Sequence, residues 1–175
     1  MKKFLINRKT ILIFSFLVLV LDQSTKYLAY TYINPNKPLI IFSNLLQLTL
    51  VRNSGAAFSL LTGYGSLLGI LSLCVSISLI IWVIKRPYIN PLKGLAMAFL
   101  LGGALGNGID RWKTGYVIDF FELIPINFPV FNFADISINI AIFLLLADTI
   151  LESINRRKST HTINPKKPIT KSKSF

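Results

Sequence analysis

Residues 64–84 read YGSLLGILSLCVSISLIIWVI and contain no charged side chain over 21 positions. A helix needs roughly 20 mostly apolar residues to cross the hydrocarbon core of a bilayer. The stretch therefore predicts a membrane-spanning helix. It also holds Cys74, the one cysteine of the chain, so an internal disulfide and a paired-cysteine metal site are excluded.

Three further apolar runs lie at residues 10–30, 92–109 and 133–154. The chain is 53% hydrophobic and 15% charged, with a mean hydropathy of +0.59. Water-soluble domains carry about 45–50% apolar and about 25% charged residues. We therefore predict an all-α membrane protein with four transmembrane helices, folded as a single integral membrane domain over residues 1–155. The first run is expected to be retained, because no small-residue cleavage site follows it.

The formal net charge is +12, from 19 Lys and Arg against 7 Asp and Glu. Fourteen of the 19 basic residues lie in three clusters, at residues 2–9, 85–93 and 156–173. Basic residues collect in cytoplasmic loops, so these clusters predict that both termini are cytoplasmic. The same placement argues against nucleic acid as a partner. The basic tail, residues 156–175, is expected to be disordered and to contact anionic lipid headgroups.

Two segments, 31–63 and 110–132, then face outward. Leu46, Leu48 and Leu50 alternate with their neighbours at the two-residue period of a strand. A second short apolar run precedes them at residues 39–42, separated by turn residues. We therefore predict a small β-sheet on the outer surface of the membrane. The other outward segment is rich in aromatic residues, a composition typical of the membrane interface.

Two aspartates occupy unusual positions near the outer ends of the spans. Asp119 follows Val117 and Ile118 and precedes two phenylalanines, and Asp135 lies near the start of the fourth helix. An acid at a helix start also fits a structural cap. If the two carboxyls met, they would share a proton, and the pair could activate water as in an aspartic protease. The sole histidine, His161, lies in the tail, which argues against histidine-based catalysis or metal binding.

Other polar residues are expected at the same depth. Asp22 and Lys26 are four residues apart and can pair on one helix face. The polar residues expected at this depth are Asp22, Gln23, Lys26, Arg52, Asn53, Asn107, Asp110, Arg111 and Asn132. Each of them, taken alone, is more typical of helix capping or packing than of catalysis.

Five strings, in this order, resemble the motifs of the lipoprotein signal peptidase (signal peptidase II) family. They are residues 22–26 (DQSTK), 52–58 (RNSGAAF), 102–111 (GGALGNGIDR), 117–120 (VIDF) and 131–135 (FNFAD). The resemblance covers about residues 10–150. It implies a membrane aspartyl endopeptidase without a metal or other cofactor. Such an enzyme removes signal peptides from prolipoproteins by cutting before the diacylglyceryl-modified lipobox cysteine.

The resemblance also implies roles for individual residues. Asp119 and Asp135 carry over as the catalytic pair. Asp22 and Lys26 carry over as supports, and the residues that line and brace the site are Asn53, Asn107, Asp110, Arg111 and Asn132. The implied partners are diacylglyceryl-prolipoproteins and membrane lipid. The expected location is the bacterial cytoplasmic (inner) membrane, with a monomeric chain and a site near the outer leaflet. We further expect Gly102, Gly103 and Gly106 to leave space for a small-residue lipobox peptide.

Two other functions are compatible with four spans. A small proton-coupled transporter would use Asp22 as its protonation site and would form a dimer, but the acids cluster at one end of the spans. A non-catalytic membrane scaffold would use the acids as caps, and its Asp119→Asn variant would behave like the wild type.

Overall fold

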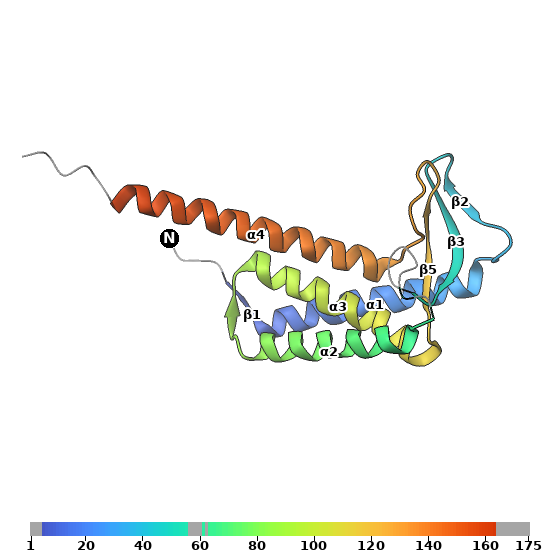
Figure 1. Ribbon diagram of the computed structural model, residues 1–175, viewed down its shortest axis with the longest axis horizontal. Helices are drawn as coiled ribbons and strands as arrows, with labels where there is room; N and C mark the ends of the chain where they lie inside the picture. Colours follow the sequence, from blue (N-terminus) through green and yellow to red (C-terminus); the bar gives the residue numbers. More distant parts are fainter. Residues whose placement is uncertain (1–4, 56–60, 62, 164–175) are drawn as a thin grey trace, which may run out of the picture.

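The computed structural model describes residues 5–55, 61 and 63–163, with the backbone alone for residues 157–163. Long helices dominate it, and short strands lie between them (Figure 1). In chain order the elements are β1 (Ile6–Asn7), α1 (Arg8–Tyr32), β2 (Leu39–Phe42), β3 (Leu46–Asn53), α2 (Gly65–Ile84), β4 (Tyr88–Ile89), α3 (Pro91–Thr114), β5 (Val117–Leu123) and α4 (Phe133–Ile163).

All four helices are long and apolar enough to cross a membrane, α4 over Phe133–Arg156. This confirms the prediction of a mostly helical membrane protein with small sheets. Helix α3 runs five residues beyond the expected end of its span, because charged residues lower the hydropathy of its last turn without breaking the helix. Gly115 ends it in the left-handed conformation, φ 80°, and donates its N–H to the carbonyl of Arg111. Helix α4 continues to Ile163, and residues 164–175 of the expected disordered tail lie outside the described residues.

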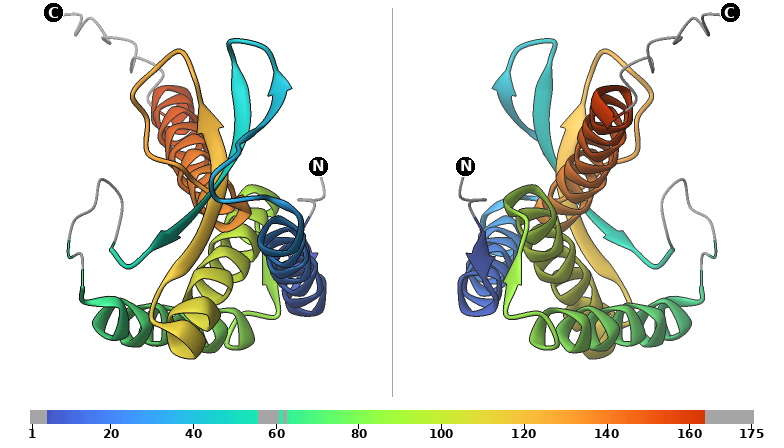
Figure 2. Two further views of the ribbon diagram at one scale, coloured as in Figure 1. Left: turned by 90° about the vertical axis from the view of Figure 1, so that its right-hand side faces the viewer. Right: turned by 90° about the vertical axis from the view of Figure 1, so that its left-hand side faces the viewer.

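Helix α3 is the centre of the bundle and packs against each of the other three helices (Figure 2). Its most apolar 18 residues are 61% buried inside the protein, against 22% for the corresponding part of each other helix. In a bilayer, apolar side chains alone do not drive helices together, because the lipid tails are equally apolar. Small residues favour association because they let the helix backbones approach closely. The site residues on α3 are therefore held from several sides.

The glycines of α3 do not leave space for a peptide, and this expectation is wrong. A Cβ on Gly102 would lie 2.6 Å from the Val18 side chain of α1, and one on Gly103 would lie 2.7 Å from the Ala134 carbonyl of α4. A Cβ on Gly106 would collide with the carboxylate of Asp22. The neighbouring helices fill the room that these glycines provide.

A three-stranded antiparallel sheet, in the order β2-β3-β5, lies at one end of the bundle (Figure 1). The predicted strands at residues 39–42 and 46–53 are confirmed as β2 and β3. The third strand, β5, comes from the other segment between helices, and its register sets Val51 opposite Asp119 and Asn53 opposite Val117. The sheet therefore joins the two segments and brings Asn53 beside Asp119.

A short antiparallel pair, β1 and β4, closes the opposite end of the bundle, beside the first two basic clusters. Asn7 caps α1 by accepting the backbone N–H of Thr10 at 2.9 Å, and Asn90 caps α3 in the same way. Arg8, Lys85 and Lys93, from the first two basic clusters, thus lie at the opposite end of the helices from the three-stranded sheet.

Changing Gly103 to alanine tests the close packing of α3. We expect the added methyl group to force α3 and α4 apart, which costs about 1–3 kcal/mol in a tightly packed contact. The thermal unfolding midpoint of the purified protein in detergent should fall. Cys74→Ala, at an exposed position of α2, is the matched control and should leave the midpoint unchanged. An unchanged midpoint for Gly103→Ala would contradict this packing.

Candidate active site

Asp119 lies on β5 and is buried, with 2% of its surface exposed. Buried carboxylates need hydrogen-bond donors, and Asp119 has one for each oxygen. Asn53 of β3 donates its Nδ2 hydrogen to Oδ2 at 2.8 Å, and Asn132 donates to Oδ1 at 2.6 Å. The Asp119 carboxylate therefore has a hydrogen-bond donor for each of its oxygens, although its neighbours in the sequence are apolar.

Asp135 lies in the first turn of α4, where it takes part in a reciprocal cap. Asn132 Oδ1 accepts the backbone N–H of Asp135 at 3.0 Å, and Asp135 Oδ2 accepts the backbone N–H of Asn132 at 3.1 Å. This is the capping-box arrangement, which satisfies backbone donors that a helix start leaves free. The other oxygen, Oδ1, accepts from Nδ2 of Asn107 at 2.9 Å. Asp135 is thus a cap and also faces the site.

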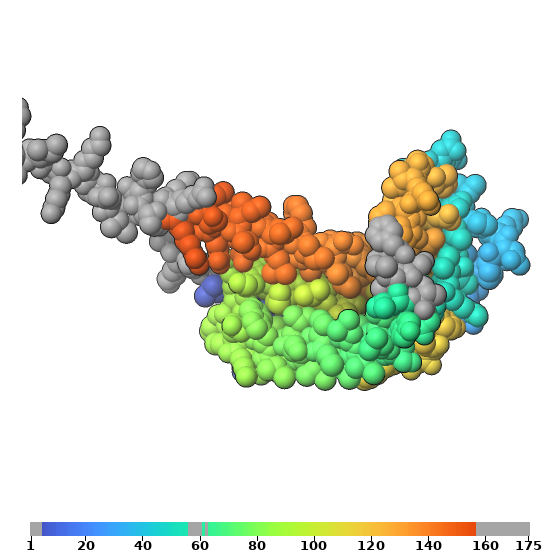
Figure 3. Space-filling model, in the orientation of Figure 1, coloured from blue at the N-terminus to red at the C-terminus, as the bar shows by residue number. Residues whose placement is uncertain are grey.

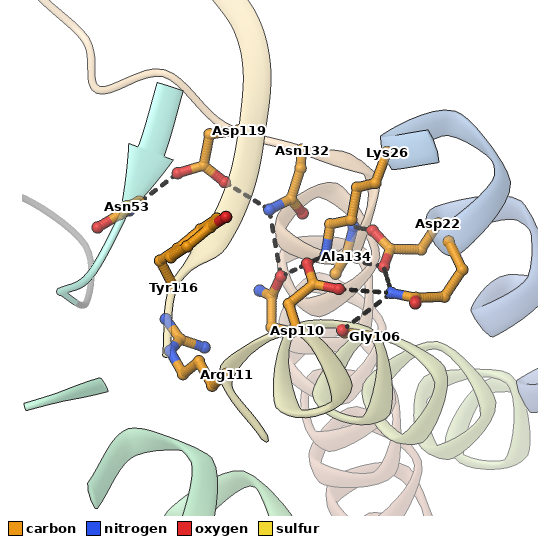
Figure 4. A network of polar contacts seen from close by, with 12 residues as sticks. Asp22, Lys26, Asn53, Gly106, Asp110, Arg111, Tyr116, Asp119, Asn132 and Ala134 are labelled. Atoms are coloured by element: carbon orange, nitrogen blue, oxygen red, sulfur yellow. Dashed lines mark hydrogen bonds and ion pairs between the residues drawn. The ribbon is translucent and has the colours of Figure 1, made fainter. Parts of the chain in front are cut away.

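Two asparagines connect the aspartates. Figure 4 shows the first of these contacts, between Asn132 and Asp119. Asn132 Nδ2 donates both to Asp119 and, at 3.1 Å, to Oδ1 of Asn107, whose own Nδ2 donates to Asp135. Asn132 is fully buried, so its amide has no access to water. The position of each carboxylate therefore depends on the same two side chains.

A second group of buried charges supports this one from α1. The Lys26 ammonium lies 2.9 Å from a carboxylate oxygen of Asp22 and 2.9 Å from one of Asp110, and its side chain is 4% exposed. Gln23 Nε2 donates to Asp110 Oδ1 at 2.9 Å. Asp22 Oδ1 accepts the backbone N–H of Ala134 at 2.8 Å, which adds a cap to the start of α4. Helix α1 therefore holds the helix end that carries Asp135.

Arg111 adds positive charge near the two aspartates. Its guanidinium donates to the backbone carbonyl of Gly55 at 2.9 Å, while its buried Nε has no partner among the described residues. It interacts electrostatically with both Asp119 and Asp135. Arg52, the other arginine of the sequence group, lies elsewhere, with its guanidinium over the rings of Tyr30 and Tyr116.

The electrostatic environment of Asp119 favours its protonated form. Burial raises the pKa of Asp119 to about 6, and the negative charge of Asp135 contributes in the same direction. The hydrogen bonds from Asn53 and Asn132 oppose the rise, because they stabilise the ionised form. A carboxyl of this kind can donate a proton near neutral pH.

Both carboxyls line a cavity of about 680 Å³. One wall is apolar and follows α4 through Ile136, Ile140 and Phe143, which are spaced as one helix face. A second wall is the loop before α4. Figure 3 shows this loop, at residues 124–131, standing beyond the end of α4 so that the two enclose a hollow corner. The remaining lining is polar: Asn53, Asn107 and Arg111.

The structure brings all nine site residues expected from the sequence together at the sheet end of the bundle. Asp119, Asp135, Asn53, Asn107 and Arg111 line the cavity, Asn132 connects the aspartates, and Asp22, Lys26 and Asp110 lie behind them. Two parts were missed. The first is Gln23, which was included among the expected polar residues without a role. The second is the apolar cavity wall, which the sequence could indicate only through the spacing of its residues on α4. Among residues 5–55, 61 and 63–163, no three His, Cys, Asp or Glu side chains form a group that could hold a metal ion.

Comparison with known proteins gives a consistent result. The family model described as signal peptidase (SPase) II matches residues 14–151. The lipoprotein signal peptidase of Parasynechococcus marenigrum (strain WH8102) is 50% identical over 132 residues, 75% of this chain and 83% of that protein. The lipoprotein signal peptidase of Brevibacillus brevis (strain 47) is 37% identical over 140 residues, 80% of this chain and 94% of its own.

The fold is also similar to a solved structure, described as a bacterial membrane enzyme structure obtained by the in meso method at 2.3 Å resolution. The TM-score is 0.77 and the sequence identity 32%, and the similarity covers 84% of this chain and 91% of the other. The similarity therefore extends over most of both chains.

Replacing Asn132 with alanine tests its double role. We expect the loss of the cap to cost about 1 kcal/mol, and the loss of the donor to Asp119 to add about 1–3 kcal/mol. Asn7→Ala removes a cap from α1 at the far end of the bundle and should show the cap cost alone. The measurement is the thermal midpoint of both variants. Equal losses would show that the contact of Asn132 with Asp119 contributes nothing to stability.

Proposed function

Because this chain belongs to the signal peptidase II family, we propose that it cuts prolipoproteins with an aspartyl pair formed by Asp119 and Asp135. The observation that carries the proposal is that both carboxyls line one cavity and are connected through Asn132 and Asn107. The cut falls immediately before the diacylglyceryl-modified cysteine, and the reaction needs no metal or other cofactor. Prolipoproteins are the substrate class that the family implies.

The two carboxyls divide the chemistry because they share one proton. The ionised carboxylate removes a proton from a water molecule, and the water oxygen bonds to the carbonyl carbon of the scissile peptide. The protonated carboxyl donates to the carbonyl oxygen, which gives a neutral gem-diol. Collapse of this intermediate breaks the C–N bond, and a proton passes to the leaving amine of the cysteine. Asp119 is the proton donor because it is the more deeply buried of the two, and Asp135 is the base.

The cavity suits a lipid-bearing peptide. Its wall on α4 consists of Ile136, Ile140 and Phe143, and Phe143 is also 70% exposed on the outer face of that helix. A substrate anchored in the bilayer by its signal peptide and its lipid can reach such a wall by lateral movement within the membrane. The polar end with Asp119 and Asp135 then meets the peptide bond beside the lipid-modified cysteine.

The protein is a multi-pass protein of the bacterial inner membrane. We place both termini in the cytoplasm and the site near the outer leaflet, which agrees with the first two basic clusters lying beside β1 and β4, away from the sheet. Residues 1–155 form one membrane domain, with residues 156–175 as a basic tail. One chain supplies all the site residues, which supports a monomer.

The two other functions fit the site less well. A proton-coupled transporter would need Asp22 to exchange protons, but Asp22 is fully buried and is bonded to Lys26 and to the backbone of Ala134. A non-catalytic scaffold would use its acidic residues only as helix caps. This function does not explain why Asp119, which lies on a strand, lines a cavity together with Asp135.

Asp119→Asn and Asp135→Asn are each expected to abolish cleavage of a diacylglyceryl-prolipoprotein. Either change removes one of the two proton-transfer groups, and general acid–base catalysis contributes about 10²–10⁴-fold to rate. The assay uses purified protein in detergent, with substrate binding measured in parallel. Glu152→Gln, at an exposed acid near the other end of α4, is the control and should cut at the wild-type rate.

Near-wild-type cleavage by either asparagine variant would disprove the aspartyl pair. Failure of the wild type to cut the lipid-modified substrate would disprove the function itself.

The pH dependence of kcat/KM should fall on the alkaline side with a midpoint of about 6. The direction follows from the role of Asp119, which must carry the proton and loses it as the pH rises through its raised pKa. Asn53→Ala removes a hydrogen bond that stabilises the ionised form, so the alkaline limb of this variant should move to higher pH. An alkaline limb that Asn53→Ala leaves in place would contradict the assignment of the proton to Asp119.

A further inference from the structure

Lys26 is separated from the aspartyl pair by one residue, Asn107. Among the described residues, its ammonium contacts Asp22, Asp110 and Asn107, and neither Asp119 nor Asp135. Its contact with Asn107 is a hydrogen bond of 2.9 Å to Oδ1. Asn107 is the residue of α3 that touches Asp135.

We propose that Lys26 is a positioning residue that fixes the side-chain amide of Asn107, so that Asn107 donates to Asp135 and holds its carboxyl group in the cavity. The inference rests on the proposed function, since it specifies how one member of that pair is held in place.

The side-chain amide of Asn107 has one orientation that suits all of its neighbours. An asparagine side chain can rotate by half a turn and exchange its oxygen and nitrogen, with little change in shape. In Asn107 the oxygen accepts from Lys26 and from Asn132, and the nitrogen donates to Asp135. Rotation would turn the NH₂ group toward two donors and the oxygen toward a carboxylate. Because an ammonium can only donate, Lys26 excludes that orientation.

Lys26 is itself held in place by buried charges. Its ammonium forms ion pairs with a carboxylate oxygen of Asp22 and with one of Asp110, each at 2.9 Å, and donates a hydrogen bond to Oδ1 of Asn107 at 2.9 Å. Gln23 donates to the other oxygen of Asp110 and so holds that carboxylate in place. The ammonium is therefore kept beside the amide oxygen of Asn107.

Several groups face Asp135. Asn107 and Arg111 lie on α3, Asp119 lies on β5, and the backbone N–H of Asn132 lies at the start of α4. Lys26, Asp22 and Asp110 lie behind Asn107. Each oxygen of Asp135 accepts one N–H, and Asn107 supplies the one side-chain donor among the described residues. The position of the Asp135 carboxyl group therefore depends on the orientation of the Asn107 amide.

The test is the double variant Lys26→Gln with Asp110→Asn. It removes the obligate donor while the charge of the group stays at −1, because one positive and one negative charge leave together. We expect kcat on a diacylglyceryl-prolipoprotein to fall about tenfold, because the Asn107 amide no longer holds Asp135 in place. KM should change by less than about twofold, because the cavity lining is untouched.

Two controls separate positioning from stability. Asp110→Asn alone keeps the Lys26 donor, so its kcat should fall less than that of the double variant. Lys113→Gln, at an exposed lysine at the same end of α3, should match the wild type in kcat and KM. A double variant whose folded molecules keep the wild-type kcat, with only the folded fraction reduced, would overturn the proposal and make Lys26 a structural residue.

The wild type in the same assay tests the proposed function separately, since failure to cleave there would precede any comparison of variants. If the double variant does not fold, solid-state NMR of the wild type decides. We expect one dipolar coupling between Lys26 Nζ and Asn107 Cγ, and another between Asn107 Nδ2 and the carboxyl carbon of Asp135. Absence of either coupling would overturn the proposal.

Discussion

The site depends on one constraint: the two carboxyl groups that line its cavity must each receive hydrogen bonds, and one of them, Asp119, is buried away from water. Asp119 receives its donors from Asn53 and Asn132, and Asp135 receives its donors from Asn107 and the backbone of Asn132. An unpaired buried carboxylate is costly, so each donor must be present in the folded state. Asn132 serves both aspartates and therefore couples them.

The rest of the fold supplies these donors from separate elements. The sheet brings Asn53 to Asp119 through the pairing of β3 with β5. The small residues of α3 let α1 and α4 approach closely, so that Asp22 reaches the backbone of Ala134. The bundle and the sheet thus assemble one polar group from five elements: α1, α3, α4, β3 and β5. Buried polar groups of this kind specify a single arrangement only when every member is satisfied.

Much of this could be predicted from the sequence. The four apolar runs give the helices, and the alternation at residues 46–50 gives β3. The resemblance of five short strings to one family gave the expected site residues. The end of α3 was missed because Asp110, Arg111 and Lys113 interrupt the hydropathy of a helix that continues through them. Strand β5 was missed because its partner, β3, lies more than 60 residues away in the chain.

Two features depend on contacts that spacing does not encode. The glycines of α3 indicated open space, but the room beside them is filled by the side chains and backbone of α1 and α4. Lys26 was expected to pair with Asp22 on one helix face, and it does, but its burial between Asp22, Asp110 and Asn107 depends on contacts with α3. In each case the residue type was informative, while its role followed from packing between helices.

The most direct test of the account is single-turnover cleavage of a diacylglyceryl-prolipoprotein in H₂¹⁸O, with EDTA present and the products analysed by mass spectrometry. The account predicts one cut, immediately before the lipid-modified cysteine, with one ¹⁸O atom in the new carboxyl terminus of the signal peptide. Loss of cleavage in EDTA, a cut at another bond, or a signal peptide without ¹⁸O would contradict water activation by Asp119 and Asp135.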